Sequence, residues 1–212
     1  MATERTARRR RDTPRKGDLR EQAILRTTEQ LLERDGVEPM TVEAIAKGAG
    51  ISRGSLYFYF GSKQEVLTAL VARTLDTLTQ DATVFPDDET TPPHQAIEHA
   101  IDRTADMWRR HGRVMRTAVD YAAVIPEIGD LWTATVATFT EVMTGVLVRA
   151  GVPEGDGPAD ATALAHTLCW MTERALYQAA SQPVPDLARA ITTCTEIWFR
   201  VIGHRDGTGS GG

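Results

Sequence analysis

The chain has 212 residues, enough for one large domain or for a small domain joined to a medium one. Its composition, 42% hydrophobic and 25% charged, is that of a globular protein and excludes fibrous and disordered classes. No run of 18 apolar residues is present, and no apolar segment follows the basic start. The sequence therefore predicts no membrane span and no signal peptide, and a cytoplasmic location.

Charge is distributed unevenly along the chain. Residues 1–70 carry 13 Lys and Arg against 10 Asp and Glu, whereas residues 71–212 carry 11 against 19. A positive excess at one end indicates an anionic partner there, and the total net charge of −5 does not exclude it because the local field is what acts. A basic arm at 1–17, predicted to be disordered, could track phosphates or enter a minor groove, or could be a solvated tail.

Helical periodicity prevails from residue 18 onward, so the predicted fold class is all-α. The first helix is expected to begin at Asp18, with Glu21 as the acid three residues on, and to stop at Gly36. Two short helices are expected next, one from Val42 to about Lys47 and one that Ser52 caps and that runs to about residue 59.

A longer helix is predicted to begin at Ser62, where Ser-Lys-Gln-Glu forms a capping box. Proline and glycine then separate five further helices, expected at 93–111, 113–123, 127–150, 158–180 and 185–202. The glycine-rich tail 203–212 is predicted to be disordered. The predicted organisation is therefore a three-helix domain at 18–61 and a larger helical domain at 62–202.

Residues 41–67 have the pattern of two helices joined by a tight turn. Ala46 is small where the helices are expected to cross closely, and Gly50 permits the backbone of the turn. At about 100° per residue, the second helix divides into two faces. The inward set is Ser52, Leu56, Tyr59 and Phe60, and the outward set is Arg53, Gly54, Tyr57 and Phe58. Two outward aromatic side chains need a partner, and a DNA backbone would supply one.

This segment resembles, almost position for position, the DNA-binding signature of the TetR family of transcriptional regulators, including the stretch 57–60 and the Ser-Lys that follows it. The resemblance implies a helix-turn-helix that contacts phosphates through Thr41, Ser52, Tyr57 and Lys63. It places Arg53, Gly54 and Ser55 at base edges in the major groove. Arg53 is the expected direct reader, because its guanidinium can bind guanine O6 and N7 together.

Other interpretations of these residues stay open. Lys63 could be a solvated lysine at a helix start, and Tyr57 could pack against the first helix. Phe58 stands where relatives have a hydroxylated aromatic, and it is left out of the predicted site because it cannot donate to phosphate. One recognition helix is too small for a specific operator, so a homodimer on palindromic double-stranded DNA is expected.

All four tryptophans lie in the second half of the chain, which indicates either an ordinary core or a pocket with flat apolar walls. Residues 168–177, 182–186 and 196–198 resemble one subgroup of the TetR family, the mycobacterial ethionamide-resistance repressors, which have a long hydrophobic ligand channel. The resemblance implies a channel for a small apolar ligand, lined by Trp108, Trp132, Phe139, Met143, Trp170, Thr172, Tyr177 and Trp198. Thr104, Cys169 and Thr172 depart from that subgroup, which argues against a shared ligand.

The remaining polar residues predict no chemistry. Glu173 and Arg174 lie amid apolar neighbours and are expected to be paired in a structural ion pair or an interface, rather than to bind ligand. Cys169 and Cys194 are expected to be small buried side chains without a disulfide. The five histidines share no ligand geometry, so neither a metal nor a cofactor is predicted. No catalytic motif is present, which disfavours an enzyme, and the acidic second half disfavours a DNA-packaging protein.

The last two helices, at about 158–180 and 185–202, are predicted to form the dimer interface. On the first of them, small residues form a stripe that would allow close approach of a second chain. That stripe comprises Ala161, Ala165, Leu168, Thr172, Ala175 and Ala179. The sequence thus predicts a repressor that a small hydrophobic ligand releases from its operator.

Overall fold

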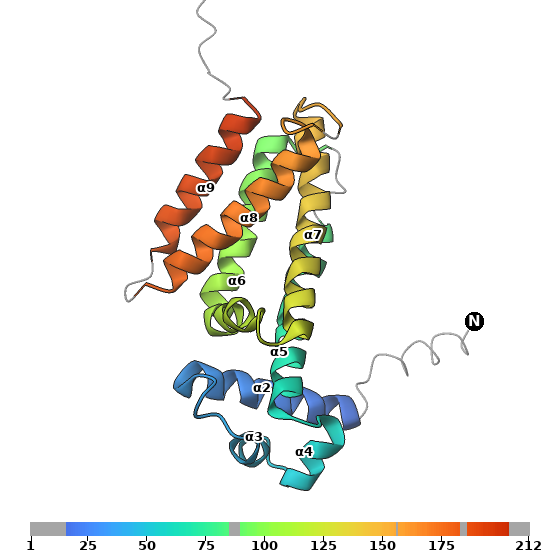
Figure 1. Ribbon diagram of the computed structural model, residues 1–212, viewed down its shortest axis with the longest axis vertical. Helices are drawn as coiled ribbons and strands as arrows, with labels where there is room; N and C mark the ends of the chain where they lie inside the picture. The colour runs from blue at the N-terminus through green and yellow to red at the C-terminus, as the bar shows by residue number, and fades with distance from the viewer. Residues whose placement is uncertain (1–15, 85–89, 156, 183–185, 204–212) are drawn as a thin grey trace, which may run out of the picture. The chain divides into compact units, whose positions relative to one another are not determined.

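The computed structural model describes residues 16–84, 90–155, 157–182 and 186–203, coloured along the chain in Figure 1. The elements in these ranges are all α-helices, which confirms the predicted all-α fold class. In chain order they are α2 (Lys16–Asp35), α3 (Val42–Gly48), α4 (Arg53–Tyr59), α5 (Lys63–Val84), α6 (Pro93–Tyr121), α7 (Pro126–Arg149), α8 (Ala161–Ala180) and α9 (Leu187–Val201). Most of the predicted arm, residues 1–15, and residues 204–212 of the predicted tail lie outside the described residues.

The chain packs as two compact units that meet between Leu70 and Val71, within α5. The first unit contains α2, α3, α4 and the start of α5. Its most deeply buried side chains are Ile24, Leu32, Met40, Ile45, Leu56, Leu67 and Leu70. Because Leu67 and Leu70 belong to this core, the first two turns of α5 pack with the small helices, although the sequence pattern placed the boundary before Ser62.

Capping side chains fix where α3 and α5 begin. Thr41 Oγ1 accepts from the backbone N of Ala44 at 3.1 Å, and Ser62 Oγ accepts from the backbone N of Glu65 at 3.1 Å, as the sequence predicts. The prediction that Asp18 caps the first helix is wrong, because α2 is already helical at Lys16. Asp18 instead lies in the first turn, where its charge favours the positive end of the helix dipole.

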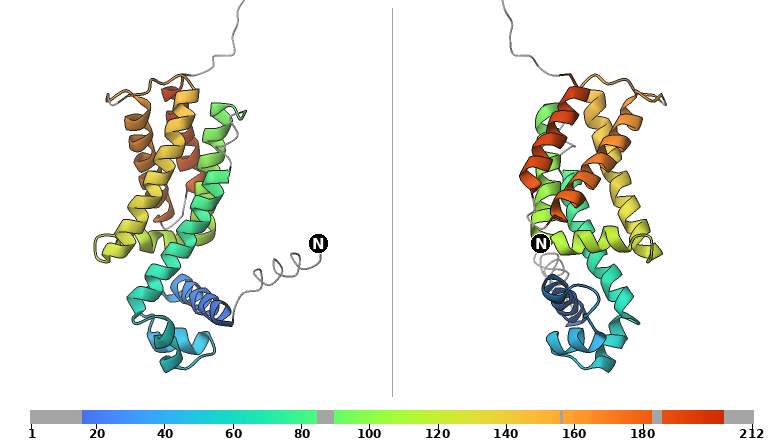
Figure 2. Two further views of the ribbon diagram at one scale, coloured as in Figure 1. Left: turned by 90° about the vertical axis from the view of Figure 1, so that its right-hand side faces the viewer. Right: turned by 60° about the vertical axis from the view of Figure 1, so that its left-hand side comes forward.

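The second unit is a bundle of α6 to α9 with the later part of α5. Helices α6, α7 and α8 pack against one another, and α9 packs against α6 and α8 (Figure 2). The core between them comprises Ile97, Ile101, Met143, Val146, Leu147, Ala161, Ala165, Leu168, Cys194 and Trp198. This core draws one apolar stripe from each of four helices, as amphipathic periodicity requires.

The break predicted between residues 111 and 113 is a kink within α6. His111 has a non-helical backbone (φ −126°, ψ 29°), while the residues on both sides are helical, and Figure 1 shows the helix changing direction there. Trp108 before the kink and Met115 after it are both buried. Glycine at 112 is a poor helix former, which favours a bend at this point. The backbone nevertheless stays helical on both sides of the bend.

Among the described residues, α7 alone is long and apolar enough to cross a membrane by length and composition. The core helix of a bundle meets the same test. Trp132, Val136 and Met143 of α7 are buried in the second unit, which accounts for the low polarity of this helix.

The small-residue stripe predicted to mediate dimerisation lies in the chain's own core. Ala161, Ala165, Leu168 and Thr172 are all buried within the single chain, packed against the other helices of the second unit. Ala175 and Ala179 of the stripe are half-buried. The prediction is therefore wrong for the four buried residues. These side chains are small because α8 crosses α6 and α7 closely in the same chain.

Candidate nucleic-acid interface and candidate ligand cavity

Helices α3 and α4 form a helix-turn-helix whose geometry depends on two glycines and an alanine. Gly50 adopts φ +67°, a left-handed conformation that other residues rarely take, and Ala46 is buried as expected. Sequence reasoning missed Gly48. A Cβ at Gly48 would stand 2.5 Å from Thr27 Cγ2 of α2, so this glycine lets α3 approach α2.

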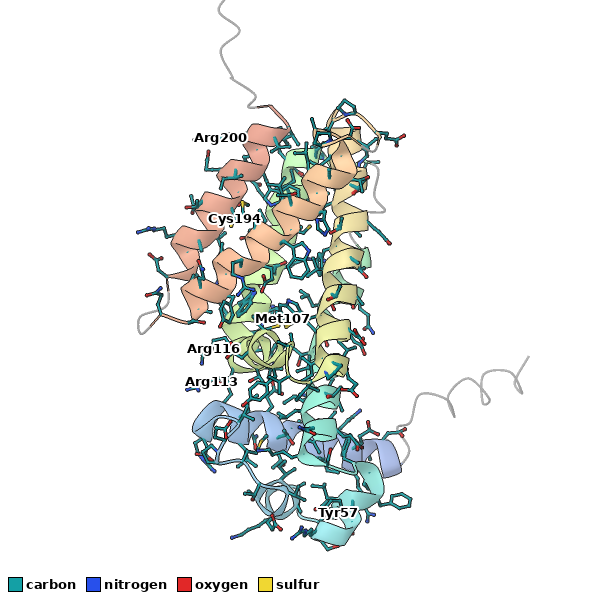
Figure 3. All side chains as sticks on the ribbon, viewed as in Figure 1. Tyr57, Met107, Arg113, Arg116, Cys194 and Arg200 are labelled. Atoms are coloured by element: carbon teal, nitrogen blue, oxygen red, sulfur yellow. The ribbon has the colours of Figure 1, made fainter. Side chains whose placement is uncertain are left out.

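Helix α4 presents one apolar and one solvent-facing side. Leu56 and Phe60 are buried, whereas Tyr57 is exposed (labelled in Figure 3) and Phe58 is 84% exposed. The two predicted faces agree with this arrangement except at Ser52, which is exposed rather than inward. Its Oγ accepts from the backbone N of Ser55 at 3.0 Å, because an N-cap side chain folds back over the first turn.

Arg53 lies at the centre of a small polar cluster on the exposed surface. Its guanidinium pairs with Glu43 of α3, donates to Tyr57 Oη at 3.1 Å and lies over the Tyr57 ring. The hydrogen bond to Tyr57, with the nearby charge of Glu43, raises the pKa of Arg53 above its ordinary value. Arg53 is therefore a charged side chain whose position is fixed by Glu43 and Tyr57. To contact base edges in DNA, it must give up its interactions with these two residues.

The other predicted DNA contacts lie at the starts of α3, α4 and α5. Thr41 precedes α3, Gly54 and Ser55 open α4, and the hydroxyls of Ser52 and Ser55 share a hydrogen bond of 2.8 Å. Lys63 at the start of α5 donates to the backbone O of Val37 at 3.1 Å. The lysine is therefore anchored to the loop after α2, with further N–H groups available to an anion.

The second unit contains a cavity enclosing about 620 Å³ between its walls, the part open to solvent included. Helices α5 to α9 all contribute to its wall. The lining residues are Leu75, Leu78, Ala100, Ile101, Thr104, Trp108, Met115, Trp132, Thr135, Val136, Phe139, Met143, Cys169, Thr172, Glu173 and Trp198.

Six of the eight residues predicted to line a ligand channel line this one cavity: Trp108, Trp132, Phe139, Met143, Thr172 and Trp198. Trp170 and Tyr177 do not. Trp170 donates from Nε1 to His166 at 3.2 Å. Tyr177 donates from its hydroxyl to Asp120 at 2.6 Å and lies edge-on to Trp108, so it supports the cavity wall from behind.

The threonine hydroxyls of the cavity wall and the indole N–H of Trp198 form hydrogen bonds within the protein. Thr104 and Thr135 donate to backbone oxygens four residues earlier in their own helices, at 2.9 Å each. Trp198 Nε1 donates to Thr172 Oγ1 at 3.0 Å. Burial raises the pKa of Cys169 to about 12, so its thiol is neutral, and both cysteines are free as expected.

The carboxylate of Glu173, in contrast, forms no hydrogen bond within the protein. Its side chain is buried, and neither carboxylate oxygen has a hydrogen-bond partner. The predicted ion pair with Arg174 forms only as a contact of 3.7 Å, too long for a hydrogen bond, and the Arg174 side chain is half exposed. Burial raises the pKa of Glu173 above its ordinary value, against the weaker opposing effect of Arg174. No cluster of potential metal ligands occurs in the described ranges.

Comparison with known proteins now identifies the family. The model of the bacterial regulatory proteins of the tetR family matches residues 24–70, and that of the C-terminal domain of the transcriptional regulator EthR matches residues 97–203. The HTH-type transcriptional regulator EthR of Mycolicibacterium smegmatis is 34% identical over 206 residues, which is 93% of each chain. The chain belongs to the TetR family.

Solved structures show that this TetR protein has the fold of the family. SmeT, the repressor of the Stenotrophomonas maltophilia multidrug efflux pump SmeDEF, superposes with a TM-score of 0.67 at 23% identity, covering 85% of this chain and 88% of its own. A transcriptional regulator from Saccharomonospora viridis in complex with choline gives 0.70 at 16% identity, with coverage of 84% and 94%. TetR proteins are DNA-binding regulators and not enzymes, which agrees with the lack of a catalytic motif.

Some lining residues of this TetR protein escaped sequence reasoning. Leu75 and Leu78 continue the apolar period of α5 and were not predicted as lining residues. Thr104 and Cys169 were noted as departures from the subgroup but not as parts of the wall. For Glu173 the signal was present, since a lone acid amid apolar neighbours on a buried helix requires a partner.

Proposed function

We propose that this protein is a cytoplasmic transcriptional repressor that binds a palindromic operator as a homodimer and is released by a small hydrophobic ligand. The observation that carries the proposal is the apolar cavity with walls from Trp108, Trp132 and Trp198, in the unit that does not contain the helix-turn-helix. Relatives named EthR are regulators of the same domain composition. The choline complex of the S. viridis regulator supports a small molecule as a partner for this fold.

Operator binding would use the outward side of the helix-turn-helix. Arg53 reads base edges, and the exposed Gly54 allows α4 to lie close to the groove. Thr41, Ser52, Tyr57 and Lys63 contact phosphates, and Ser55 lies at the base edges beside Arg53. The hydroxyl oxygen of Thr41 accepts from a backbone amide, so its hydrogen stays available to a phosphate oxygen. The Ser52 hydrogen is available in the same way when Ser55 is the donor of their shared hydrogen bond.

Dimerisation would use the solvent-facing sides of α8 and α9, opposite the buried stripe. Thr167, Arg174 and Gln178 are exposed on α8, and Thr193 and Glu196 are exposed on α9. The two helices lie side by side (Figure 1), so that a two-fold copy would complete a four-helix arrangement.

Ligand response would pass along α5, a continuous helix from Lys63 to Val84. Lys63 belongs to the predicted DNA contacts, and Leu75 and Leu78 of the same helix line the cavity. A ligand changes operator affinity only if it binds the DNA-incompetent arrangement more tightly than the competent one. Filling the cavity would favour a different position of α5 and hence a different spacing of the two recognition helices.

Footprinting of the full-length protein on its own promoter region tests this function. Protection of a discrete palindrome that n-decanol or another hydrophobic probe removes is the expected result. Arg53→Ala should lose about 1–3 kcal/mol on the operator but little on random DNA. The control Arg149→Ala removes the same charge from the exposed end of α7 and should leave the footprint unchanged.

Two results would contradict the proposal. Equal losses for Arg53→Ala on operator and random DNA would remove Arg53 as a reader of bases. A footprint that no hydrophobic probe weakens, in the wild type or in Trp132→Ala, would remove the sensing role and leave a DNA-binding regulator without a ligand.

A further inference from the structure

We propose that the ligand of this cavity carries a cationic hydrogen-bond donor, the protonated nitrogen of a hydrophobic amine, and that the carboxylate of Glu173 binds it. This inference rests on the proposed sensing function and specifies the chemical class of the ligand. It starts from Glu173, a buried acid of the cavity wall whose two carboxylate oxygens have no hydrogen-bond partner.

Glu173 is buried with only 7% of its surface exposed, and neither Oε1 nor Oε2 accepts a hydrogen bond. No other buried side-chain oxygen or nitrogen in the described part of the chain lacks a partner. A buried carboxylate without donors is costly, by more than the typical gain from one hydrogen bond. An acid at such a position is expected to meet its partner in another state of the protein.

No donor in the described part of the cavity wall hydrogen-bonds to the Glu173 carboxylate. The hydroxyls of Thr104 and Thr135 are committed to backbone oxygens, and the indole N–H of Trp198 is committed to Thr172. Arg174 is the nearest cation, but its Nε stands 3.7 Å away and its guanidinium lies over the Tyr177 ring. A molecule inside the cavity would supply the missing donors.

The position of Glu173 on α8 places its side chain in the cavity wall. Cys169, Thr172 and Glu173 are spaced by three and four residues, so they share one helix face, and all three line the cavity. The other two offer no charge, because the thiol of Cys169 is neutral and the Thr172 hydroxyl is engaged with Trp198. Glu173 is the only ionisable acid in the wall.

The remaining wall suits an alkyl chain with a positive end. Trp108, Trp132 and Trp198 present indole rings, and such rings attract ammonium groups in addition to burying apolar surface. Low polarity around the carboxylate strengthens its attraction to a cation because little water screens it. A primary ammonium brings three donors, enough for both carboxylate oxygens.

A neutral ligand with a carbonyl group is the competing occupant. It would require a protonated Glu173, which could donate one hydrogen bond but would leave its second oxygen without a donor. The amine satisfies both oxygens and compensates the charge, so the geometry favours it.

Three probes of similar chain length separate these ligands: n-decylamine, n-decanol and 2-undecanone. Their affinities for the full-length protein would be measured by tryptophan fluorescence and calorimetry, below micelle-forming concentrations, together with their effect on operator binding. We expect n-decylamine to bind wild-type protein at least about tenfold more tightly than n-decanol. Glu173→Gln should abolish that preference and retain n-decanol binding. Glu141→Gln, which removes an exposed carboxylate of α7, should behave as wild type.

The possible results distinguish failure of this inference from failure of the proposed sensing function. Equal affinity of wild type for amine and alcohol, an amine preference that persists in Glu173→Gln, or a preference for the ketone would each overturn this inference while leaving sensing intact. If no probe binds or weakens operator binding, the sensing function fails as well. Even if Glu173→Gln does not fold, the wild-type comparison tests whether the cavity prefers an amine, because equal affinity for amine and alcohol overturns the inference.

Discussion

Cys169 and Glu173 lie four residues apart on the cavity face of α8, and burial shifts both side chains toward their neutral forms. The cause is the same for each, because a low-polarity wall disfavours the ionised group. The consequences differ. A neutral thiol can be buried among apolar residues at little cost in free energy, whereas a carboxyl group needs hydrogen bonds in either protonation state. These two residues therefore give separate experimental measures of how dry the cavity is.

Cys169 should resist alkylation. Burial raises the pKa of its thiol to about 12, three units above the ordinary value of 9.0, so the reactive thiolate at pH 8 falls by about a thousandfold. Iodoacetamide labelling followed by peptide mass spectrometry measures the rate, with the urea-unfolded protein as the control. Labelling of Cys169 in the folded protein at the rate found in urea would show that the cavity is wet.

Glu173→Met should stabilise the protein at neutral pH. Because the pKa of Glu173 is raised in the folded state, the folded protein binds the proton more tightly than the unfolded chain. The ionised form therefore opposes folding above the folded-state pKa, and this opposition disappears as pH falls to the ordinary value. We expect a gain of about 1–3 kcal/mol at pH 7.5 that shrinks at pH 5.

Chemical denaturation at the two pH values measures this gain. Glu141→Met, on the exposed side of α7, is the control and should change stability by no more than about 0.5 kcal/mol. A methionine variant less stable than wild type at pH 7.5 would mean that Glu173 has partners in the folded protein.

Helix geometry explains which predicted ligand contacts the structure brings together. The family resemblance placed Trp170 and Thr172 in one channel, but residues two apart on a helix point about 200° apart. Thr172 lies on the cavity face of α8, so Trp170 must lie away from it. Trp108, Trp132 and Trp198 could be predicted as a group, because each lies on the apolar stripe of its own helix. How deep a stripe lies, and hence which of its residues line a cavity, depends on how helices pack and cannot be obtained from periodicity.

At the scale of elements, the turn between α3 and α4 requires a left-handed residue. Gly50 has φ +67°, and alanine there should cost about 1–2 kcal/mol of stability and weaken operator binding through misplacement of α4. Thermal unfolding and a gel-shift titration measure the two effects. The control is Gly145→Ala within α7, where a Cβ meets nothing closer than 3.8 Å, and a gain of about 0.5–1 kcal/mol is expected. Unchanged stability of Gly50→Ala would mean that the turn can relax.

Element limits were predictable where a capping side chain or a glycine sets them. Thr41, Ser52 and Ser62 begin helices because their oxygens accept from the first turn, and that signal is local. The start of α2 and the continuity of α6 through His111 were not predictable in this way. At the kink of α6, the buried side chains of Trp108 and Met115 on either side support helical backbone beyond the local stop signal, so tertiary contacts override propensity there.

At the scale of the whole molecule, the proposed function requires two copies of the chain, and α8 bears on which side is available for contact. Its small residues Ala161 and Ala165 are buried within the chain, so we expect a partner to meet the opposite side. Periodicity showed that α8 has a stripe of small residues. It could not show that the stripe serves the chain's own core, because close helix crossings within and between chains select the same residue types.

Arginine on the exposed sides of α8 and α9 should therefore give monomers. Thr167→Arg and Thr193→Arg each place a long cation where the partner copy is expected, and burying it without a counter-charge is unfavourable. Sedimentation velocity measures the oligomeric state, and gel-shift titration measures operator affinity. Because a palindrome is bound by two recognition helices together, loss of the dimer should weaken operator binding by far more than binding to random DNA.

The matched control is Ala137→Arg, which adds the same side chain to an exposed position of α7. It should stay dimeric and bind the operator as wild type does. If both threonine variants also stay dimeric at micromolar concentration, the interface lies elsewhere. If they become monomeric but keep full operator affinity, dimerisation contributes nothing to recognition, and a single helix-turn-helix would have to supply all of the specificity.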